Sequence, residues 1–478
     1  MPDDEFLTLR EAATLFGKTP SNISYLLQYQ RIHKYNQFGE RIDRAKGGQL
    51  RVSKNELSAY FKGQDIEVQE TLQKVKGQSG AVESALAFAE LSERERTKHV
   101  HRLHPYLGKF IPQLAEFFLK RAFKPGDWIL DPFAGSGTTL VEANVLGIHS
   151  IGIDISEFNC LMTRAKVARY DLKRMEKELW GIYELVSSQF QSKSAEGVTL
   201  DQFFQKKEES TEIPDNSYPL LTTPYLTTWF ASQTLRELSL YRHLIQDYAY
   251  QDLMKVILSR TARSTRLTLH FELTRPSSPV CEPYYCHKHS KKDRPKICAP
   301  VQTALKHLRK YTTDTLRRVS EFSQLRTEAE AHALQEDARS VDLGEEILSQ
   351  RKLSGVFTSP PYVGVLDYHE QHRYAYELLG LPWHAQEEIG PASKGASQRA
   401  QEDYVAAMAA VFRNIAPCLA KDARVFVVAN DKHDLYPEIA AMSGYAIHQR
   451  YERPVIKKAS RERTPYFETI FELRHEDN

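Results

Sequence analysis

Residues 127–154 read DWILDPFAGSGTTLVEANVLGIHSIGID, and this stretch decides the fold. The apolar run Trp128-Ile129-Leu130 predicts a buried strand, and Thr138–Leu146 predicts a helix. A second apolar run, Ile151-Gly152-Ile153, predicts another strand that ends at Asp154. A strand, a helix and a second strand form a βαβ unit, so we expect a parallel sheet in an α/β fold.

The loop between the first strand and the helix favours a nucleotide-like ligand. Gly135 and Gly137 allow the backbone to approach a ligand, and the following helix offers unpaired N–H groups to a carboxylate or phosphate. Asp154 lies about 20 residues further on, where an acid accepts hydrogen bonds from both ribose hydroxyls. The pattern is not G-x-G-x-x-G, and the Lys-Ser/Thr pair of a P-loop is missing. A dinucleotide and S-adenosylmethionine (SAM) both fit.

Residues 356–362 read VFTSPPY, which is a second strand end with distinct chemistry. Proline donates no backbone N–H, so Pro360 and Pro361 must end the apolar strand. We expect this end at the carboxyl edge of the sheet, where ligands of open α/β folds bind. The oxygens of Ser359 and Pro360 can accept hydrogen bonds from an exocyclic NH2 group, and Tyr362 offers a face for a planar base.

Together these segments resemble the amino-DNA methyltransferases, which methylate N4 of cytosine or N6 of adenine. DPFAGSGTT resembles the family's cofactor motif, SPPY (359–362) its catalytic motif, and HPYLGKFIPQL (104–114) the segment beside the methionine end of the cofactor. The resemblance implies a Rossmann-like SAM methyltransferase sheet, with Asp154 on the ribose and Asp337 of EDAR near the adenine. The implied catalytic residues are Ser359, Pro360, Pro361 and Tyr362. The implied cofactor-binding residues are Tyr106, Gly108, Lys109, Phe110, Asp131, Pro132, Phe133, Ala134, Gly135, Ser136, Gly137, Thr138, Asp154, Ile155, Asp337 and Ala338.

The first residue of the catalytic motif bears on the target base. In the family, serine is seen mostly in N4-cytosine enzymes and aspartate in N6-adenine enzymes, so Ser359 favours cytosine and leaves adenine as the alternative. Attack at C5 would need a nucleophilic thiol, but Cys418 lies at a predicted helix end and is interpreted as structural. Polar residues after the motif are either pocket and phosphate contacts, or helix caps and a solvated face. They are Asp367, His369, Glu370, His372 and Arg373.

The rest of the chain divides by composition. Residues 1–63 predict two helices, a Gly-rich turn, a short strand and a helix, which resembles the winged helix-turn-helix of excisionase-like and MerR-like domains. Ser21, Asn22 and Tyr25 on its second helix are candidates for the major groove, although a packing module without DNA contact fits the same pattern. Residues 64–100 form a polar linker. The resemblance implies a methyltransferase core in residues 101–170 and 331–478, and we expect 171–330 to be an inserted, mostly helical DNA-recognition region.

The second half of the inserted region is unusually basic. From Lys255 to Ser320 there are 15 Lys and Arg against 4 Asp and Glu, a local charge of +11 in a chain that carries +2. Arg260, Arg263 and Arg266 are the candidates for contacts with phosphates or guanine edges.

Three cysteines and two histidines of the same region invite a zinc interpretation. They are Cys281, Cys286, His287, His289 and Cys298. Their spacing matches no C-x2-C pattern, so we expect cysteines without a metal ion.

The length and composition of the chain limit the classes of protein to which it can belong. The chain has 478 residues, 41% hydrophobic and 26% charged, which favours two or three globular domains. It has no apolar run of about 18 residues, no secretory signal pattern and too few cysteines for a disulfide framework, so we expect a cytoplasmic protein without membrane partners.

The expected function is sequence-specific methylation of cytosine N4 in double-stranded DNA by base flipping. We expect it to belong to a restriction-modification or related system, with a separate cognate endonuclease. The alternatives are an N6-adenine DNA methyltransferase, an RNA or protein methyltransferase, and a DNA-binding regulator with a dead core.

Overall fold

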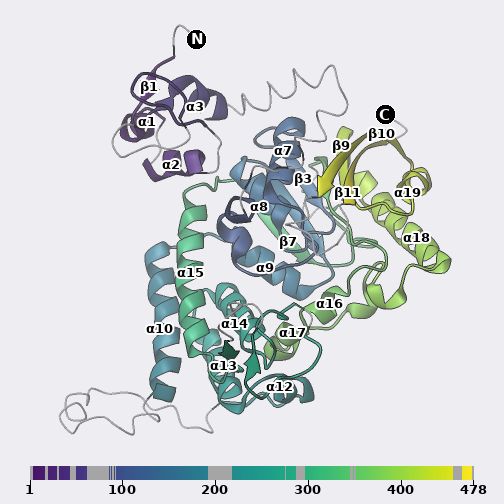
Figure 1. The fold of residues 1–478 in the computed structure, drawn as a ribbon. Helices are drawn as coiled ribbons and strands as arrows, with labels where there is room; N and C mark the ends of the chain where they lie inside the picture. Colours follow the sequence, from purple (N-terminus) through teal and green to yellow (C-terminus); the bar gives the residue numbers. More distant parts are fainter. Residues whose placement is uncertain are drawn as a thin grey trace.

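The computed structural model describes residues 4–16, 20–28, 32–42, 50–61, 86, 88, 91, 93–191, 218–274, 276–286, 296–344, 348, 351–455 and 466–475 (Figure 1). A sheet with helices on both faces forms its centre, and a group of long helices extends from one side. No helix in these ranges is long and apolar enough to span a bilayer.

Seven strands of the described chain form one sheet. They are β3 (Trp128–Asp131), β4 (His149–Asp154), β7 (Ala331–Gln335), β8 (Leu353–Thr358), β9 (Leu419–Ala429), β10 (Tyr445–Val455) and β11 (Tyr466–His475). Their spatial order is β10-β11-β9-β8-β3-β4-β7, and β11 runs against the other six. The parallel β3–β4 pair confirms the predicted βαβ unit, and the sheet is the mostly parallel kind expected of a Rossmann-like methyltransferase.

The chain changes direction across the sheet between β3 and β8. From β3 the strands continue to β4 and β7 on one side, whereas β8 and β9 lie on the other. Leu130 pairs with Val356, so the ends of β3 and β8 are direct neighbours. Open parallel sheets bind ligands beyond the carboxyl ends of their strands at such a point. The fold therefore places the glycine loop after β3 beside the SPPY segment after β8.

Successive side chains of the central strands pack on opposite faces of the sheet, as the pleat requires. Ile129 joins an apolar cluster with Phe118 of α7 (Pro112–Ala122). Leu130 joins a separate cluster with Met408 of α18 (Gln398–Ile415) and Ile439 of α19 (Tyr436–Ser443). The β3–β4 connection is α8 (Thr138–Val145), and α9 (Glu157–Val167) follows β4. Both faces of the sheet are thus covered, which leaves its carboxyl edge for a site.

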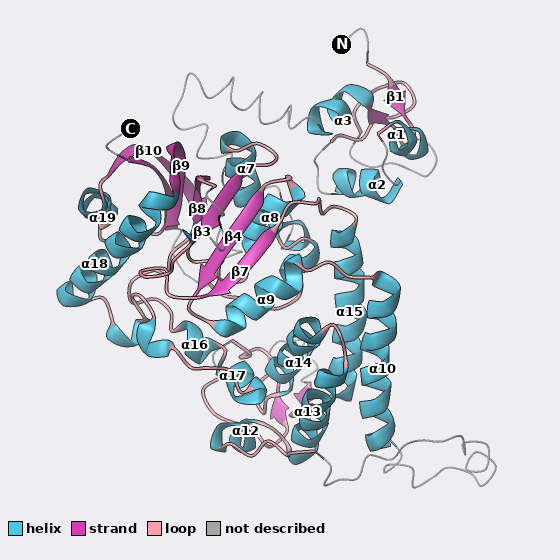
Figure 2. Ribbon diagram, turned by 180° about the vertical axis from the view of Figure 1, so that it is seen from behind, coloured by secondary structure: helices cyan, strands magenta, loops and turns pink. Residues whose placement is uncertain are grey.

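The described residues between 172 and 323 are mostly helical. The helices are α10 (Leu172–Gln191), α12 (Pro224–Trp229), α13 (Ser232–Leu244), α14 (Gln251–Thr265) and α15 (Leu305–Ser323), with a two-residue strand pair, β5 (Tyr284–Tyr285) and β6 (Ile297–Cys298). α10 and α15 lie side by side (Figure 2). Their apolar residues share one cluster with α9 and with α17 (Arg373–Leu379). The helices therefore pack onto the core rather than standing apart from it. The described residues also contain short helices: α6 (Glu93–Arg96), η1 (His99–Arg102), η3 (Ile245–Asp247), α16 (Tyr368–Gln371), η5 (Ala385–Glu387), η6 (Ala392–Lys394) and η7 (Ala416–Cys418).

The N-terminal residues form a small unit with its own apolar cluster. It contains β1 (Phe6–Leu7), α1 (Leu9–Leu15), α2 (Pro20–Gln28), β2 (Val52–Ser53) and α3 (Lys54–Phe61), and β1 pairs antiparallel with β2. Thr8 caps α1, and Glu11 completes a capping box. The expected succession of two helices, a strand and a helix is confirmed. Gly47-Gly48 and most of the expected linker lie outside the described residues.

Candidate active site

A cleft with about 830 Å³ of open space lies beyond the carboxyl ends of β3, β4, β7 and β8. We call it the sheet-edge cleft. Its walls come from the 104–114 segment, the glycine loop, the ends of β4 and β7, the SPPY segment and the loop before α18. The lining residues are Tyr106, Gly108, Lys109, Phe110, Pro132, Phe133, Ala134, Gly135, Ser136, Thr138, Asp154, Ile155, Ser156, Asn159, Glu336, Asp337, Ala338, Ser359, Pro361, Tyr368, His369, Glu387, Glu388 and Ile389.

The glycine loop has a backbone shape that larger residues resist. Gly135 has φ +52°, and a Cβ atom there would lie 3.2 Å from the Tyr106 hydroxyl on the cleft wall. Gly137 has φ +74° at the N-cap of α8, and its Cβ would lie 2.7 Å from Thr163. Residues other than glycine rarely adopt such φ values. The two glycines are therefore needed to fold the loop tightly against the cleft.

Asp154 is the centre of the cleft's hydrogen bonding. Its carboxylate accepts bonds from the backbone N–H groups of Gly135 (2.8 Å) and Ser156 (2.9 Å) and from Asn159 Nδ2 (3.1 Å). Burial raises the pKa of Asp154 above its ordinary value, and these hydrogen bonds oppose the shift. The carboxylate is thus fixed in place at the cleft wall.

Asp131 has a different position from the one implied by the motif. Its side chain is buried behind the cleft, where Oδ1 accepts bonds from Thr358 Oγ1 (2.6 Å) and the Phe133 N–H (3.1 Å). Burial raises its pKa to about 6. Since Thr358 ends β8, Asp131 joins the glycine-loop strand to the SPPY strand. Gly137, Pro360 and Tyr362 are likewise absent from the lining.

Two tyrosine hydroxyls anchor the SPPY segment, one from Tyr404 and one from the segment's own Tyr362. Ser359 and Pro361 line the cleft, and Pro360 is buried. The carbonyl of Pro361 accepts a hydrogen bond from Tyr404 Oη at 2.9 Å. Tyr362 Oη donates to Glu468 at 3.3 Å, so its ring is tied to β11. Ser359 itself lines the cleft beside this anchored part of the segment.

The 104–114 segment forms another wall of the cleft. Lys109 Nζ donates to the His101 carbonyl at 2.8 Å, and burial together with the charge of Arg102 lowers the pKa of Lys109 to about 8. Tyr106 Oη accepts a bond from Asn159 Nδ2 at 3.2 Å. The structure therefore places Tyr106, Gly108, Lys109 and Phe110 together with the glycine loop around one cavity.

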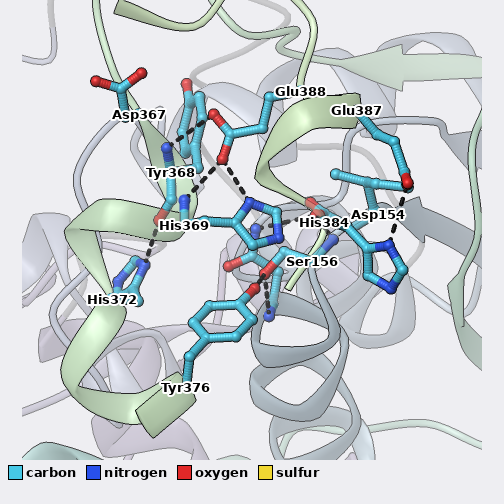
Figure 3. A network of polar contacts seen from close by, with 12 residues as sticks. Asp154, Ser156, Asp367, Tyr368, His369, His372, Tyr376, His384, Glu387 and Glu388 are labelled. Carbon is cyan, nitrogen blue, oxygen red and sulfur yellow. Dashed lines mark hydrogen bonds and ion pairs between the residues drawn. The ribbon is translucent and has the colours of Figure 1, made fainter. Parts of the chain in front are cut away.

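Several lining residues are absent from the motif comparison. Figure 3 shows His369 held by Glu388, whose Oε1 accepts bonds from the His369 backbone N–H (2.7 Å) and from Nδ1 (2.5 Å). Ser156 Oγ contacts Tyr376 Oη at 2.6 Å in the same network. Ser156 and Asn159 follow Asp154 at the start of α9, where Ser156 caps the helix. A serine at this point is a helix-start signal that the sequence contains. Glu388 is 19 positions from His369, and no local pattern indicates it.

Some of the polar residues after SPPY lie at a cleft, and others form internal contacts or a solvent-exposed face. His369 lines the sheet-edge cleft, whereas Asp367 accepts bonds from Ser393 (N–H 2.9 Å, Oγ 2.8 Å). Glu370 and Arg373 form a partly exposed pair at 3.6 Å, which is the solvated face. His372 lies in a neighbouring cleft and contacts the ring of Tyr106.

The polar atoms of the cleft fit a ligand with a ribose, an amine and a carboxylate. Among the described residues, Ser136 Oγ, Asn159 Oδ1 and His369 Nε2 are buried and have no hydrogen-bond partner. All three residues line the cleft beside Asp154. A buried polar group without a partner costs free energy, so a polar ligand would satisfy them. SAM has the groups required.

Only some of the predicted DNA-binding arginines lie where they could contact DNA. Arg266 is 4% exposed, contacts the Leu273 carbonyl and lies over the Tyr374 ring at 4.7 Å. Arg260 pairs with Asp314 at 2.7 Å, yet it lines a cleft with Arg263 that adjoins the sheet-edge cleft through Tyr106 and Lys109. A further cleft continues from Arg102 and Arg260 along α15. We call this series the basic groove; it includes Arg102, Arg260, Arg263, Lys310 and Arg317.

The remaining candidates are the α2 residues, the cysteines and the two histidines. Ser21, Asn22 and Tyr25 belong to α2, but their side chains lie outside the described part of the chain, as do His287 and His289. Cys281 is exposed. Cys286 and Cys298 lie together with His270, which the sequence did not suggest. Burial raises the pKa of the Cys418 thiol, as suits a structural residue.

Comparison with known proteins agrees with this geometry. A DNA methylase family model, N6_N4_Mtase, matches residues 14–164. Type II methyltransferase M.MjaII of Methanocaldococcus jannaschii is 39% identical over 538 aligned positions, which cover 100% of this chain and 98% of that protein. M.BsoBI of Geobacillus stearothermophilus is 32% identical over 21% of this chain and 20% of its own length. A tRNA (guanine(10)-N2)-dimethyltransferase of M. jannaschii is 28% identical over 33% of this chain and 48% of its own length. Given the match along its whole length, the chain belongs to the type II DNA methyltransferases.

Proposed function

We propose that this enzyme methylates N4 of cytosine within a specific sequence of double-stranded DNA. The observation that carries the proposal is that Ser359, the glycine loop and Asp154 line one cleft. When bound there, SAM supplies an electrophilic methyl group, which the exocyclic nitrogen takes with loss of one proton and release of S-adenosylhomocysteine. A nucleobase buried in a duplex cannot reach such a cleft, so the target base must flip out.

The cofactor would be held by residues on three strand ends. The Asp154 carboxylate is placed to accept bonds from the ribose hydroxyls, since its position is fixed by Gly135 and Ser156. The unpartnered Ser136 Oγ and the start of α8 offer donors for the carboxylate of the methionine moiety. Asp337 and Ala338 follow β7 and would lie beside the adenine.

The amino group would be held by the oxygens of Ser359 and Pro360. The Pro361 carbonyl is already engaged by Tyr404, so the acceptors before it are the ones left for a substrate. Holding both amine protons orients the nitrogen lone pair towards the methyl group. Tyr362 would stack on the base, with its hydroxyl anchored to Glu468. Serine at the first position favours cytosine; N6 of adenine is the alternative.

The basic groove offers a path for the DNA backbone next to the base pocket. Arg263 and Lys109 lie where it meets the sheet-edge cleft, and Lys310 and Arg317 extend it along α15. Lysine and arginine contacts with phosphates position a duplex, while base contacts supply sequence specificity. We assign the enzyme to the modification activity of a restriction-modification system, with the endonuclease on a separate chain.

Methyl transfer from tritium-labelled SAM tests the proposal. The full-length enzyme is incubated with duplex DNA, with single-stranded DNA and with tRNA, and labelled nucleosides are separated by chromatography. N4-methyldeoxycytidine from duplex DNA is the expected product. N6-methyldeoxyadenosine would contradict the choice of base, and labelled tRNA with unlabelled DNA would contradict the choice of substrate.

Ser359→Ala tests the catalytic assignment. We expect a loss of labelling of at least about 100-fold, in the range seen when a positioned transition-state hydrogen bond is removed, with SAM affinity changed little in calorimetry. Ser188→Ala is the matched control, because Ser188 is exposed on α10 and bonds only within its own helix. Full labelling by the Ser359→Ala variant would remove the serine from the mechanism.

A further inference from the structure

The chain between α14 and α15 contains a cluster of three metal-binding side chains. His270, Cys286 and Cys298 each bring one ligand atom into a group in which all atoms lie within 4.8 Å of one another. His270 Nε2 lies 3.2 Å and Nδ1 3.8 Å from Cys286 Sγ. The cluster is separate from the sheet-edge cleft, and none of its members lines that cleft.

The strand pairing explains how two of the three side chains meet. Tyr284 of β5 pairs with Cys298 of β6 in antiparallel register. Cys286 is two residues after Tyr284, so period-two alternation puts it on the same face, diagonally across from Cys298. The Cys286 N–H donates to the Lys296 carbonyl at 2.8 Å, which continues the pairing. Two thiols far apart along the hairpin therefore share one side of it.

Tyr284 fixes the third side chain. Its hydroxyl lies 3.0 Å from the His270 backbone nitrogen and 3.0 Å from His270 Nδ1. With Nδ1 engaged by the hydroxyl, Nε2 is the ring nitrogen that faces Cys286. A histidine that binds a metal typically has its other ring nitrogen held in this manner, which sets the ring orientation.

The described residues around the cluster have little other internal support. Among the described residues from 269 to 299, Cys286 is the one buried residue. β5 and β6 have two residues each, and a strand pair that short is not stable alone. Such a segment typically needs a disulfide or a metal to hold it. Cys286 and Cys298 are not joined by a disulfide.

We propose that His270, Cys286 and Cys298 bind a zinc ion that holds this segment together. Two thiolates and one imidazole are ligands that zinc prefers. Zn–S bonds of about 2.3 Å and Zn–N bonds of about 2.0 Å at a tetrahedral angle give an S···N separation of about 3.5 Å. The observed distance between Cys286 Sγ and His270 Nε2, the ring nitrogen left for the ion, is 3.2 Å, slightly shorter than that value. The three side chains leave one tetrahedral position for a further ligand.

The ion would act on the shape of the basic groove. Arg266 contacts the Leu273 carbonyl, and Arg263 Nη2 contacts Thr274 Oγ1 at 3.4 Å, both just after His270. Fixing His270 therefore fixes the loop that holds these two arginines. Loss of zinc should lower the thermal stability and weaken DNA binding, while SAM affinity stays the same because the sheet-edge cleft is separate.

Metal analysis of the full-length enzyme tests this proposal independently of its activity. The protein is purified without a histidine tag, dialysed against metal-free buffer and measured by inductively coupled plasma mass spectrometry. We expect about one zinc per chain, in line with a structural site. Cobalt substitution should give the intense thiolate-to-cobalt absorption in the near ultraviolet.

The variants His270→Ala, Cys286→Ser and Cys298→Ser should lose the zinc and the cobalt absorption. Cys418→Ser is the matched control and should retain both, since Cys418 lies beside β9 away from the cluster. Cys286 is fully buried, so if its variant does not fold, the partly exposed His270 and Cys298 decide the test. Absence of zinc in the parent protein, zinc retained by all three variants, or a Cys286–Cys298 disulfide in the intact mass would overturn the proposal.

Discussion

The sheet-edge cleft and the basic groove differ in how the sequence encodes them. Cleft residues such as Gly135, Asp154 and Ser359 lie at or just after the ends of apolar strands, and parallel strands bring such positions to one edge. The groove is built from helices whose charged residues interact with each other. Asp314 alone pairs with Arg260, at 2.7 Å, and also with Arg317 and Arg318. A motif at a strand end predicts a position, whereas a count of charges does not predict which charges remain for a ligand.

Asp154→Ala should produce the largest effect and tests the cleft side of this comparison. The variant loses the acceptor for Gly135, Ser156 and Asn159, and the proposed ribose contacts. We expect SAM affinity to fall by about 1,000-fold, or about 4 kcal/mol, since hydrogen bonds to a charged group contribute about 1.5–3 kcal/mol each. Calorimetric titration measures the change.

Glu157→Ala is the control for this variant. Glu157 lies three residues further on, at the surface of α9, and pairs with Arg164 at 2.7 Å. It should bind SAM like the parent enzyme. Equal affinities for the Asp154→Ala and Glu157→Ala variants would mean that the cleft does not hold the cofactor through Asp154.

The second largest effect concerns Asp131, which joins the two strand ends from behind. Its pKa is about 6 in the folded protein, against 3.8 for the unfolded chain, because of burial. Between these values the folded state keeps a proton that the unfolded state has lost, so stability falls as the pH rises. A shift of about two units corresponds to about 3 kcal/mol. Asp131→Asn has no such titration.

The measurement is the free energy of unfolding in urea from about pH 4.5 to about pH 7.5, a range that spans the titration of a carboxyl with this raised pKa. The parent enzyme should lose stability relative to the Asp131→Asn variant up to about pH 6, and the difference should then stay constant. Parallel curves over this range would show that the carboxyl does not titrate as its burial requires. Because only the slope is compared, any constant cost of the amide group does not affect the result.

The sequence predicted those parts of the site that rest on local backbone geometry. The strands around Gly135 and Asp154 lie where the apolar runs place them. Ser156 and Asn159 carry a recognisable helix-start pattern after Asp154. Glu388 could not be predicted, since a long loop brings it to His369.

The contacts of the helical region could not be predicted either, because they also join residues far apart in the sequence. The burial of Arg266 depends on Tyr374, which is more than 100 positions away in sequence. His270 meets Cys286 only because the hairpin after it folds back. Such contacts form between elements with independent local signals, so neither partner indicates the other. Tertiary packing, rather than composition, decides which basic and sulfur-containing residues act together.

Arg266→Gln tests whether a buried arginine serves the fold rather than DNA. The change removes a donor from the Leu273 carbonyl and a cation from the Tyr374 ring. We expect a loss of stability of about 2 kcal/mol in urea unfolding. The salt dependence of DNA binding should stay as in the parent enzyme. A smaller slope of log DNA affinity against log salt concentration, with unchanged stability, would show that Arg266 contacts DNA.

Lys310→Gln should have the smallest effect. In contrast to Arg266→Gln, it should change the salt dependence of DNA binding and leave the stability unchanged. Lys310 is exposed on α15 where the basic groove runs along it, and its removal breaks no described ion pair. A lost phosphate contact lowers the slope of log affinity against log salt concentration by about 0.9, with stability unchanged. Lys173→Gln on the exposed side of α10 is the control and should leave the slope intact. If both lysine variants bind duplex DNA alike at every salt concentration, the backbone does not follow α15, and the groove must be sought on another face of the helices.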